Sequence, residues 1–472
     1  MTFLVEGFDP DAIALARLLA ADGESVRLAS PADEPAEAAS LREIGIHVEP
    51  HADLDTDPGP AEIAYLDVWT PEVAPRVAKL RAQGTRVSCL GDLLLERWPG
   101  PSIGITGTAG KTTTTSLVAA ILRTAGIEIA VSRGARAGNL WPTGDLLDRL
   151  RPPGTTGSPP AAVLLLELTS SHLAFMHHSP TLAAVISFWP DHLELHGDLG
   201  RYRAAKETIV RHQRAGDAVV VNADDASASF AAATPADLTE FSLAHPVAKG
   251  AYLDPARGVV LADPTGETGL RPIHAHAAHP GNVVAAAAIA AAAGASPAAI
   301  EQGIRTAATL PWRAQPLPVQ TQGPLGGIVV VDDGMAATPR KTQATLAAYP
   351  DHSVVLIAGG LNDAGGGRVH ATPEEQTLLE RACDEIARTA RVVVLFGYGG
   401  ARLAPLLRQR RVETLMAADL AEAVAVAAGR AADAAGAAAA VVFSPLFPLP
   451  LEERARFASL VREVGGVAQP RR

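Results

Sequence analysis

Cysteine and long apolar runs are both scarce in this chain of 472 residues. Two cysteines, Cys89 and Cys383, are too few for a disulfide framework and are typical of a reducing compartment. The N-terminus lacks the basic segment and long apolar core of a signal peptide, and the alanine-rich run at 285–293 is too short to span a bilayer. We therefore predict a cytoplasmic protein with no membrane insertion.

The chain also has few basic residues: 40 lysines and arginines against 51 acidic residues give a net charge of −11. This balance argues against a nucleic-acid partner or an anionic membrane surface. Hydrophobic residues make up 48% of the chain, which is enough to bury a sizeable core. At this length we expect about three domains, and the sequence contains no internal repeat of fixed period.

Glycine is sparse where a dinucleotide-binding fingerprint would need it. The turn at 7–11, Gly-Phe-Asp-Pro-Asp, has one glycine, whereas the fingerprint needs three. The alternation of apolar strands and helical patterns still predicts an α/β fold built from parallel sheets. Breaks at 98–101 and 310–311 divide it into three domains, each a largely parallel sheet with flanking helices. Their expected bounds are residues 1–98, 99–309 and 310–472.

The expected elements follow hydrophobic periodicity. Strands are expected at 3–6, 25–28, 64–68, 162–166, 183–187, 218–221, 327–331, 353–358, 392–396 and 440–443. Helices are expected at 11–21, 114–122 and 282–293, and a surface loop at the Pro/Gly/Ser/Thr-rich segment 152–160.

The segment 104–113, Gly-Ile-Thr-Gly-Thr-Ala-Gly-Lys-Thr-Thr, is the strongest chemical signal in the chain. A glycine-rich turn between a strand and a helix directs several backbone N–H groups to one point, where the helix dipole and Lys111 add positive charge. Thr112 follows the lysine, where a hydroxyl usually holds phosphate-bound Mg²⁺. The strict pattern has glycine at position 105, so this loop is a variant. An ordinary strand–turn–helix is the alternative.

Further polar residues follow the loop. Glu167 ends an apolar run, so it is placed to hold Mg²⁺, or it is a solvated strand-end carboxylate. The next hydroxyls, at 169–171, offer ligand contacts or a helix cap.

The segment 189–196, Trp-Pro-Asp-His-Leu-Glu-Leu-His, offers further metal ligands, with Lys206 a short helix away. By composition alone, Lys206 is a solvated helix-face cation. His196 and the pair at 177–178 are then surface residues, and the histidines at 274–279 form a strand rather than a metal site.

Five motifs together resemble the Mur ligases, the ATP-dependent amino-acid ligases of peptidoglycan precursor synthesis. They are the segment 104–113, Leu-Glu-Leu-Thr-Ser-Ser at 166–171, Asp-His-Leu-Glu at 191–194, Tyr-Arg-Ala-Ala-Lys at 202–206 and Val-Val-Asn-Ala-Asp-Asp at 220–225. The segments 70–71, 91–93 and 138–140 are similar to the branch that adds glutamate to UDP-N-acetylmuramoyl-L-alanine. The resemblance spans the chain and implies a UDP-binding domain, a central P-loop ATPase domain and an amino-acid-binding domain.

The resemblance implies ATP as a cofactor with Mg²⁺, in two sites. It assigns ATP contacts to Gly107, Thr108, Ala109, Gly110, Lys111, Thr112, Thr113, Asn282, Arg313 and Asp333. The resemblance implies that Thr112 and Glu167 bind one Mg²⁺ and that His192 and Lys206 bind the other. Lys206 is then a carbamylated lysine, a CO₂ adduct that changes a cation into a metal-binding anion. The residues implied to be catalytic are Lys111, Glu167, His192 and Lys206.

The implied substrates are UDP-N-acetylmuramoyl-L-alanine and glutamate, bound through Thr70, Asn139, Thr169 and Ser444. In the implied reaction the acceptor carboxylate takes the γ-phosphoryl group, and the amine of glutamate then displaces phosphate from the acyl phosphate. Closure of the third domain over the second would exclude water. We expect a monomer.

The chain departs from the D-glutamate-adding pattern at its C-terminal part. Met335 and Asp363 stand where a lysine is common, although a dicarboxylate substrate should meet cations. Leu451 stands near a usual phenylalanine, and Ala285 replaces a second asparagine. The segment 333–339 is similar to a divergent subgroup that includes L-glutamate-adding ligases. The alternatives are therefore L-glutamate, a related ligase for another amino acid, or a catalytically weak nucleotide-binding paralogue.

Overall fold

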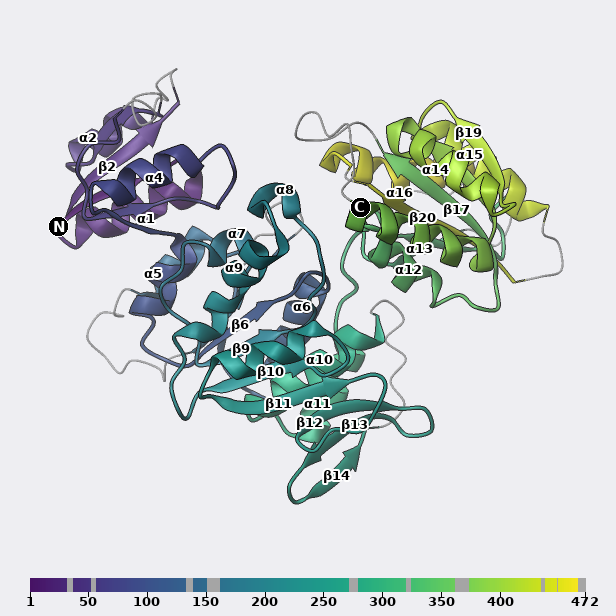
Figure 1. Cartoon of the computed structure of the whole chain (residues 1–472), viewed down its shortest axis with the longest axis horizontal. Coiled ribbons are helices and arrows are strands. Elements are labelled where there is room, and N and C mark those ends of the chain that lie inside the picture. The colour runs from purple at the N-terminus through teal and green to yellow at the C-terminus, as the bar shows by residue number, and fades with distance from the viewer. Residues whose placement is uncertain are drawn as a thin grey trace, which may run out of the picture. The chain divides into compact units, whose positions relative to one another are not determined.

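The computed structural model in Figure 1 describes residues 1–31, 37–51, 57–132, 139–150, 162–270, 279–319, 324–360, 373–433, 438–447 and 449–465. It divides into two compact units, residues 1–274 with 280–307, and residues 275–279 with 308–472. Three mostly parallel sheets with flanking helices confirm the predicted α/β class. The first two sheets lie in one compact unit, so the predicted boundary at residue 98 stays a prediction.

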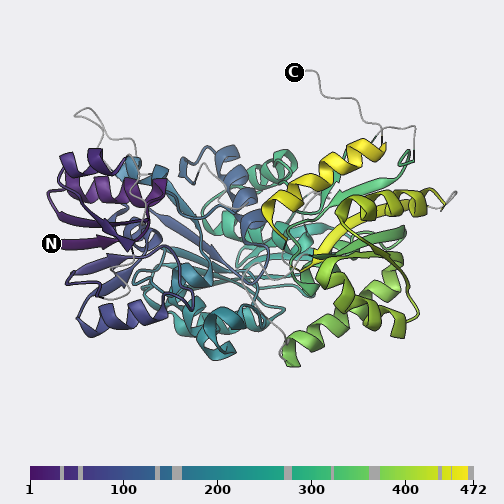
Figure 2. The same ribbon diagram turned by 90° about the horizontal axis from the view of Figure 1, so that it is seen from above.

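The first sheet is entirely parallel, with the strand order β3-β2-β1-β4-β5. Helices lie on both of its faces, as the purple elements of Figure 2 show. The strand predicted at 64–68 is shorter in the structure and ends at Tyr65. The strands are β1 (Thr2–Val5), β2 (Ser25–Ser30), β3 (His47–Pro50), β4 (Ile63–Tyr65) and β5 (Arg86–Ser88). The helices are α1 (Pro10–Ala21), α2 (Ala38–Glu43), α4 (Ala74–Ala82) and α5 (Leu90–Arg97).

The N-terminus of α1 is capped by the carboxylate of Asp9. Asp9 Oδ1 accepts hydrogen bonds from the backbone N–H groups of Asp11 (3.0 Å) and Ala12 (2.9 Å), and Pro10 starts the helix. A carboxylate therefore satisfies the donors that a glycine-rich turn would direct at a phosphate. This geometry agrees with the missing glycine fingerprint.

The second sheet has nine strands in the order β14-β13-β12-β11-β10-β9-β6-β8-β7. Its parallel part carries the phosphate loop, whereas β12, β13 and β14 pair antiparallel with one another and were not predicted. The strands are β6 (Ser102–Thr106), β7 (Ile129–Ala130), β8 (Val163–Glu167), β9 (Leu182–Val185), β10 (Ala218–Asn222), β11 (Asp237–Ser242), β12 (Gly250–Asp254), β13 (Gly258–Asp263) and β14 (Gly266–Gly269). The α-helices are α6 (Lys111–Thr124), α7 (Ser170–Leu173), α8 (Leu193–His196), α9 (Leu199–Arg211), α10 (Pro280–Ala292) and α11 (Pro297–Thr306), with 3₁₀ turns η1 (Gly144–Leu150) and η2 (Ala226–Ala233).

Small residues allow close packing beside the phosphate-loop helix. The alanine run of α10 is buried from residue 283 to residue 290, and this helix packs against α6, β11 and β12. On the neighbouring helix α11, a Cβ at Gly303 would lie 2.5 Å from Ile121 Cα. Among the described residues, no helix combines the length and the apolar character needed to cross a bilayer.

The sheet of the second unit runs β15-β16-β20-β17-β18-β19, and only β15 is antiparallel. Its side chains alternate between two cores: Val330, Val441 and Phe443 face α15 and α16, whereas Val331, Ala440 and Val442 face α12, α13 and α14. Figure 2 shows these two helix layers in yellow and green. The strands are β15 (Gln315–Leu317), β16 (Val329–Asp332), β17 (Ser353–Gly360), β18 (Ala390–Phe396), β19 (Glu413–Ala417) and β20 (Ala439–Leu446). The helices are α12 (Pro339–Leu346), α13 (Pro373–Thr389), α14 (Gly397–Gln409), α15 (Leu420–Ala432) and α16 (Leu451–Gly465).

Some predictions fall outside the described residues. They are the surface loop at 152–160, the histidines at 274 and 276, and Asp363.

Candidate active site

The predicted phosphate loop lies between the buried strand β6 and helix α6. Gly110 has a φ of +83°, and a Cβ there would collide with Asn282 Oδ1, so this position requires glycine. Ser187, just after β9, fixes the loop, because its Oγ accepts from Ala109 N and donates to Ala109 O, each at 3.0 Å. The predicted helix at 114–122 is longer and begins at Lys111, so the loop leads directly into the helix N-terminus. Asn282 therefore lies beside the loop, and its ATP contact stays a prediction.

Thr112, Asn139 and Glu167 converge at the start of α6. Thr112 Oγ1 lies 3.0 Å from Glu167 Oε1 and 3.2 Å from Asn139 Oδ1. Glu167 is fully buried, and its other oxygen accepts from Leu140 N at 2.8 Å. The alternative interpretation of Glu167 as a solvated carboxylate at the end of a strand is therefore wrong. Three oxygen-bearing side chains from α6, β8 and the segment after β7 meet beside the phosphate loop.

The two lysines of this site lie on the same loop. Lys111 Nζ donates to Gly107 O at 2.9 Å, and Lys206 Nζ donates to the same oxygen at 3.0 Å and to Thr106 Oγ1 at 3.2 Å. Lys206 is 1% exposed, so the solvated cation expected from composition is wrong. Burial, and secondarily the charge of Lys111, lowers the pKa of Lys206 well below its ordinary value, whereas Asp191 opposes this shift.

A strained turn carries the neighbouring acid and histidine. His192 has a φ of +53°, an uncommon conformation for a residue other than glycine, and its side chain is 44% exposed. Asp191 Oδ2 is buried without a hydrogen-bond partner among the described residues, and His192 Nε2 lies 3.8 Å from it. Tyr202 lies beneath this turn; its hydroxyl is 2.9 Å from Thr108 Oγ1, and Lys206 Nζ is 5.0 Å from its ring.

His196 is not the surface residue predicted from composition. It is 6% exposed, and its Nε2 lies 3.0 Å from Ser170 Oγ, so α8 is joined to α7. Burial lowers the pKa of His196 to about 4. Thr169 is the N-cap of α7, and its Oγ1 also lies 3.0 Å from Nδ1 of the buried His172. Thr169 is therefore the helix cap that the sequence allowed, and its ligand contact stays a prediction.

Thr70 approaches this same region from the first sheet. The preceding residue, Trp69, donates its backbone N–H to Ser171 O at 3.1 Å and its indole N–H to Leu195 O at 3.0 Å. Thr70 is half-buried next to these contacts and hydrogen-bonds Glu72, which lowers the pKa of that carboxyl. The segment around Thr70 is therefore joined to α7 and α8 within the first unit.

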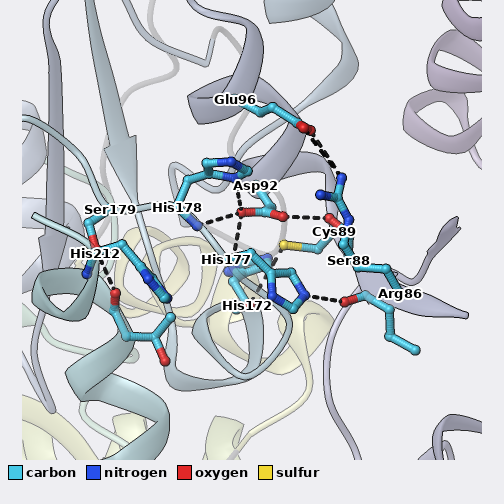
Figure 3. A network of polar contacts seen from close by, with 12 residues as sticks. Arg86, Ser88, Cys89, Asp92, Glu96, His172, His177, His178, Ser179 and His212 are labelled. Carbon is cyan, nitrogen blue, oxygen red and sulfur yellow. Dashed lines mark hydrogen bonds and ion pairs between the residues drawn. The ribbon is translucent and has the colours of Figure 1, made fainter. Parts of the chain in front are cut away.

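A buried network joins α5 to the segment that follows α7 (Figure 3). The fully buried Asp92 accepts from Ser88 Oγ at 2.7 Å, from the backbone N–H groups of His177 and His178, and from His178 Nδ1 at 2.9 Å. His177 Nε2 also lies 2.8 Å from Val87 O. The histidines at 177–178, predicted as surface residues, therefore also form hydrogen bonds that connect the first two sheets of the unit. The sequence points to Asp92 only as part of a motif.

The predicted site residues of the second unit include two buried polar side chains. Asp333 accepts from Ala314 N at 3.1 Å, Thr345 Oγ1 at 2.5 Å and Ser444 Oγ at 3.2 Å, while Ser444 is fully buried. Burial raises the pKa of Asp333 to about 6. Arg313 lies between two residues in the left-handed region, Trp312 and Ala314. The structure brings Asp333 and Ser444 together within this unit.

Arg454, on the first turn of α16, is a residue that sequence reasoning misses. Its Nη1 lies 2.7 Å from Met335 Sδ, the residue that departs from the expected D-glutamate-adding pattern. The signal that could have found it is its position, since Arg454 follows closely on Leu451, itself a departure from the pattern.

No group of three or more His, Cys, Asp or Glu side chains in the described ranges could hold a metal ion by itself. Mg²⁺ usually binds through one or two carboxylates, with phosphate and water oxygens completing its shell. The oxygens of Thr112 and Glu167 beside the phosphate loop fit this pattern. The buried Asp191 Oδ2, which has no hydrogen-bond partner among the described residues, is a further hard oxygen near the loop.

Comparison with known proteins places this chain in a family. Residues 105–258 match the model of the Mur ligase middle domain. A UDP-N-acetylmuramoylalanine–D-glutamate ligase of Frankia casuarinae is 35% identical, with 76% of this chain and 74% of that protein aligned. The protein of the same name from Symbiobacterium thermophilum is 31% identical over 84% of this chain and 82% of its own length. The UDP-N-acetylmuramate–alanine ligase of Thermotoga maritima has a similar fold (TM-score 0.57, 19% identity, 98% and 99% of the two chains covered).

The chain belongs to the Mur ligase family, whose members are ATP-dependent amide ligases. The family predicted from the sequence motifs is therefore confirmed.

Proposed function

We propose that this protein joins glutamate to UDP-N-acetylmuramoyl-L-alanine, at the expense of ATP, in peptidoglycan precursor synthesis. The relatives at 35% and 31% identity carry the name of this activity and align with three quarters or more of the chain. The convergence of Thr112, Asn139 and Glu167 next to Lys111 is the observation that carries the proposal, because a lysine and oxygens that can hold Mg²⁺ stabilise the charge of a transferring phosphoryl group.

The reaction needs two anions to approach each other. The acceptor carboxylate attacks the γ-phosphorus of ATP, ADP leaves, and the amine of glutamate then attacks the acyl phosphate and releases phosphate. Lys111 lies at the phosphate loop, where its ammonium can neutralise the phosphates once they displace its contact with Gly107 O. The loop N–H groups and the α6 dipole orient the phosphates.

Two magnesium sites are part of the proposal. Thr112 and Glu167 would hold the first, and His192 and Lys206 the second, close to Asp191. Bound Mg²⁺ stabilises charge that develops on the phosphate oxygens. Glu167 supplies its carboxylate already fixed by Leu140 N, so little reorganisation is needed.

The protonation state of Lys206 is compatible with the proposed carbamate. CO₂ reacts with a neutral amine, and burial lowers the pKa of Lys206, which favours that form. Its Nζ lies on the loop next to Gly107 O, so an adduct there would bring oxygens near the phosphates. The ATP contacts of Arg313 and Asp333, the substrate contacts of Thr70, Asn139, Thr169 and Ser444, a monomeric state and a cytoplasmic location complete the proposal.

A phosphate-release assay tests this function directly. Purified protein with ATP, Mg²⁺ and UDP-N-acetylmuramoyl-L-alanine should release phosphate only when glutamate is added, and the product mass should show the added residue. Running D- and L-glutamate side by side identifies the enantiomer. ATP binding without turnover for any amino acid would reject the ligase and favour a nucleotide-binding paralogue.

L-Glutamate is the second candidate, and Met335 favours it. This residue replaces a lysine common in the D-glutamate-adding pattern, so the groups that meet the amino acid differ here. Turnover with L-glutamate alone would establish this candidate.

A further inference from the structure

The β16–β20 pair of the second unit forms a topological switch point. These neighbouring parallel strands pair from Val329↔Ala440 to Asp332↔Phe443. The helix after β16, α12, packs on one face of the sheet, whereas the helix after β20, α16, packs on the other. Ligands of open α/β sheets bind outside the carboxyl ends of strands at such points.

Arg454 lies at this switch point and has no anionic partner within the part of the unit that is described. A Cβ on Gly334, which follows β16, would lie 3.5 Å from Arg454 Cβ. Among the described residues the guanidinium donates only to Met335 Sδ, and a thioether is a weak acceptor. Its Nε is buried without a hydrogen-bond partner in the same ranges. The adjacent acid, Glu453, pairs instead with Arg456 at 2.7 Å.

A half-buried guanidinium without an acid is costly unless a ligand supplies the acceptor. Burial also lowers the pKa of Arg454 below its ordinary value, which reflects the same desolvation. The planar guanidinium matches a carboxylate through two parallel hydrogen bonds. The acids at the strand end do not serve as this partner: Asp333 is bonded to Thr345 and Ser444. Asp332 accepts from Gly334 N through Oδ1, and its Oδ2 is buried without a hydrogen-bond partner among the described residues, so it does not bond the guanidinium either.

We propose that Arg454 binds a carboxylate of the incoming amino acid at this switch point. The arginine on α16 then provides the positive charge that Met335 does not. This inference rests on the proposed function for the identity of the ligand, and it names a specificity-determining residue for it. The methionine places no competing charge next to the guanidinium.

The test compares Arg454→Gln with Arg456→Gln in the full chain. Arg456 is on the same helix, half-exposed and paired with Glu453, so its loss removes the same charge without touching the switch point. Arg454→Gln should raise the KM for glutamate about 10- to 100-fold and leave the KM for ATP and for the acceptor unchanged. Arg456→Gln should leave all three unchanged. An unaltered glutamate KM in Arg454→Gln would overturn the proposal.

A second experiment moves the positive charge from position 454 to position 335. The double variant Met335→Lys with Arg454→Met should return the glutamate KM to within a few-fold of the wild type, because a cation again lies at the switch point. Met335→Lys alone places an ammonium against the guanidinium and should lower the melting temperature. No recovery in a double variant that folds and binds ATP would count against the proposal.

Direct binding separates this inference from the proposed function. Calorimetric titration of glutamate into the wild type and Arg454→Gln measures affinity without turnover, and Arg454→Lys serves if the glutamine variant does not fold. Weaker binding in the variant supports the inference even if no ligation is found. Equal binding rejects it, although ligation by the wild type would leave the proposed function intact.

Discussion

The phosphate-loop centre of the first unit and the switch point of the second differ in how their buried charges are satisfied. In the first, Glu167 accepts two hydrogen bonds and Lys206 donates two. Asp191 Oδ2 is the exception, because it is buried without a hydrogen-bond partner among the described residues. In the second, Asp332 Oδ2 and Arg454 Nε are both buried without hydrogen-bond partners among the described residues. Buried polar groups are normally paired, so each exception calls for an explanation. We infer that the first centre is largely organised before its ligands arrive, whereas the second keeps bonding capacity for one.

The largest effect expected from this comparison is at Glu167. Glu167→Gln keeps the size of the side chain but removes the charge and one acceptor, so kcat should fall at least about 100-fold. The melting temperature should fall by only a few degrees, because one hydrogen bond of about 1 to 3 kcal/mol is lost. Phosphate release and differential scanning calorimetry measure these effects.

Glu240→Gln is the matched control, because Glu240 is a half-buried acid on β11 of the same sheet. Its kcat should equal that of the wild type. Glu167→Gln with normal turnover would show that the convergence with Thr112 and Asn139 is structural only.

Lys206 should show an effect of comparable size, which two variants of different side-chain volume can measure. Lys206→Ala removes the amine and leaves a space beside the loop, whereas Lys206→Met fills that space. Both should lose ligation by about 100-fold or more if a carbamate oxygen contributes to the phosphate site. Millimolar acetate should partly restore Lys206→Ala, since a small carboxylate can occupy the space, and it should leave Lys206→Met inactive.

The two variants also test the comparison itself. Lys206→Met should be at least as stable as the wild type, because a buried amine with a lowered pKa is replaced by an apolar chain. Full ligation in Lys206→Met would reject the role of the amine, and equal acetate responses would reject the carbamate.

How much could be predicted from sequence differs between the two regions for a physical reason. The phosphate loop is a contiguous segment, so its glycines, Lys111 and Thr112 are readable by spacing. The interpretation of Lys206 from composition is wrong, because its burial depends on contacts with Thr106 and Gly107, which lie 100 and 99 residues earlier in the chain. Only the resemblance of several motifs together corrects that assignment.

Every strand range predicted from hydrophobic periodicity overlaps an observed strand, because buried parallel strands are continuous apolar runs. The strands β3, β5, β7, β11, β15 and β19 are missed. The antiparallel strands β12 to β14 are missed as well: β14 contains no apolar residue, whereas the apolar run 259–262 of β13 was a signal that the sequence offered. Arg454 is missed because its meaning depends on contact with Met335, which is 119 residues away in the chain. An arginine in a helix with acidic neighbours is typical of a solvated ion pair.

The smallest expected effect concerns the pH dependence of the second unit. Burial, and secondarily the charge of Asp333, raises the pKa of Asp332 to about 7, whereas the Gly334 N–H opposes this change. Between about pH 4 and pH 7 the folded unit therefore holds a proton that the unfolded chain has released. The stabilising contribution is complete below about pH 4 and is lost as the pH rises towards 7. It is at most on the order of a few kcal/mol, because a tenfold change in proton affinity is worth about 1.4 kcal/mol.

Hydrogen exchange of the peptide spanning β16 isolates this effect from the first unit. Protection of residues 329–333 should fall between about pH 4 and pH 7 after correction for intrinsic exchange, and Asp332→Asn should flatten the profile. Asp351→Asn, at an exposed acid of the same unit, should keep the wild-type slope. If Asp332→Asn retained that slope as well, the buried proton would belong to another group, and Asp333, with its pKa of about 6, would be the next to substitute. A slope that disappears when glutamate is bound would link the unpaired charges of this switch point to its ligand.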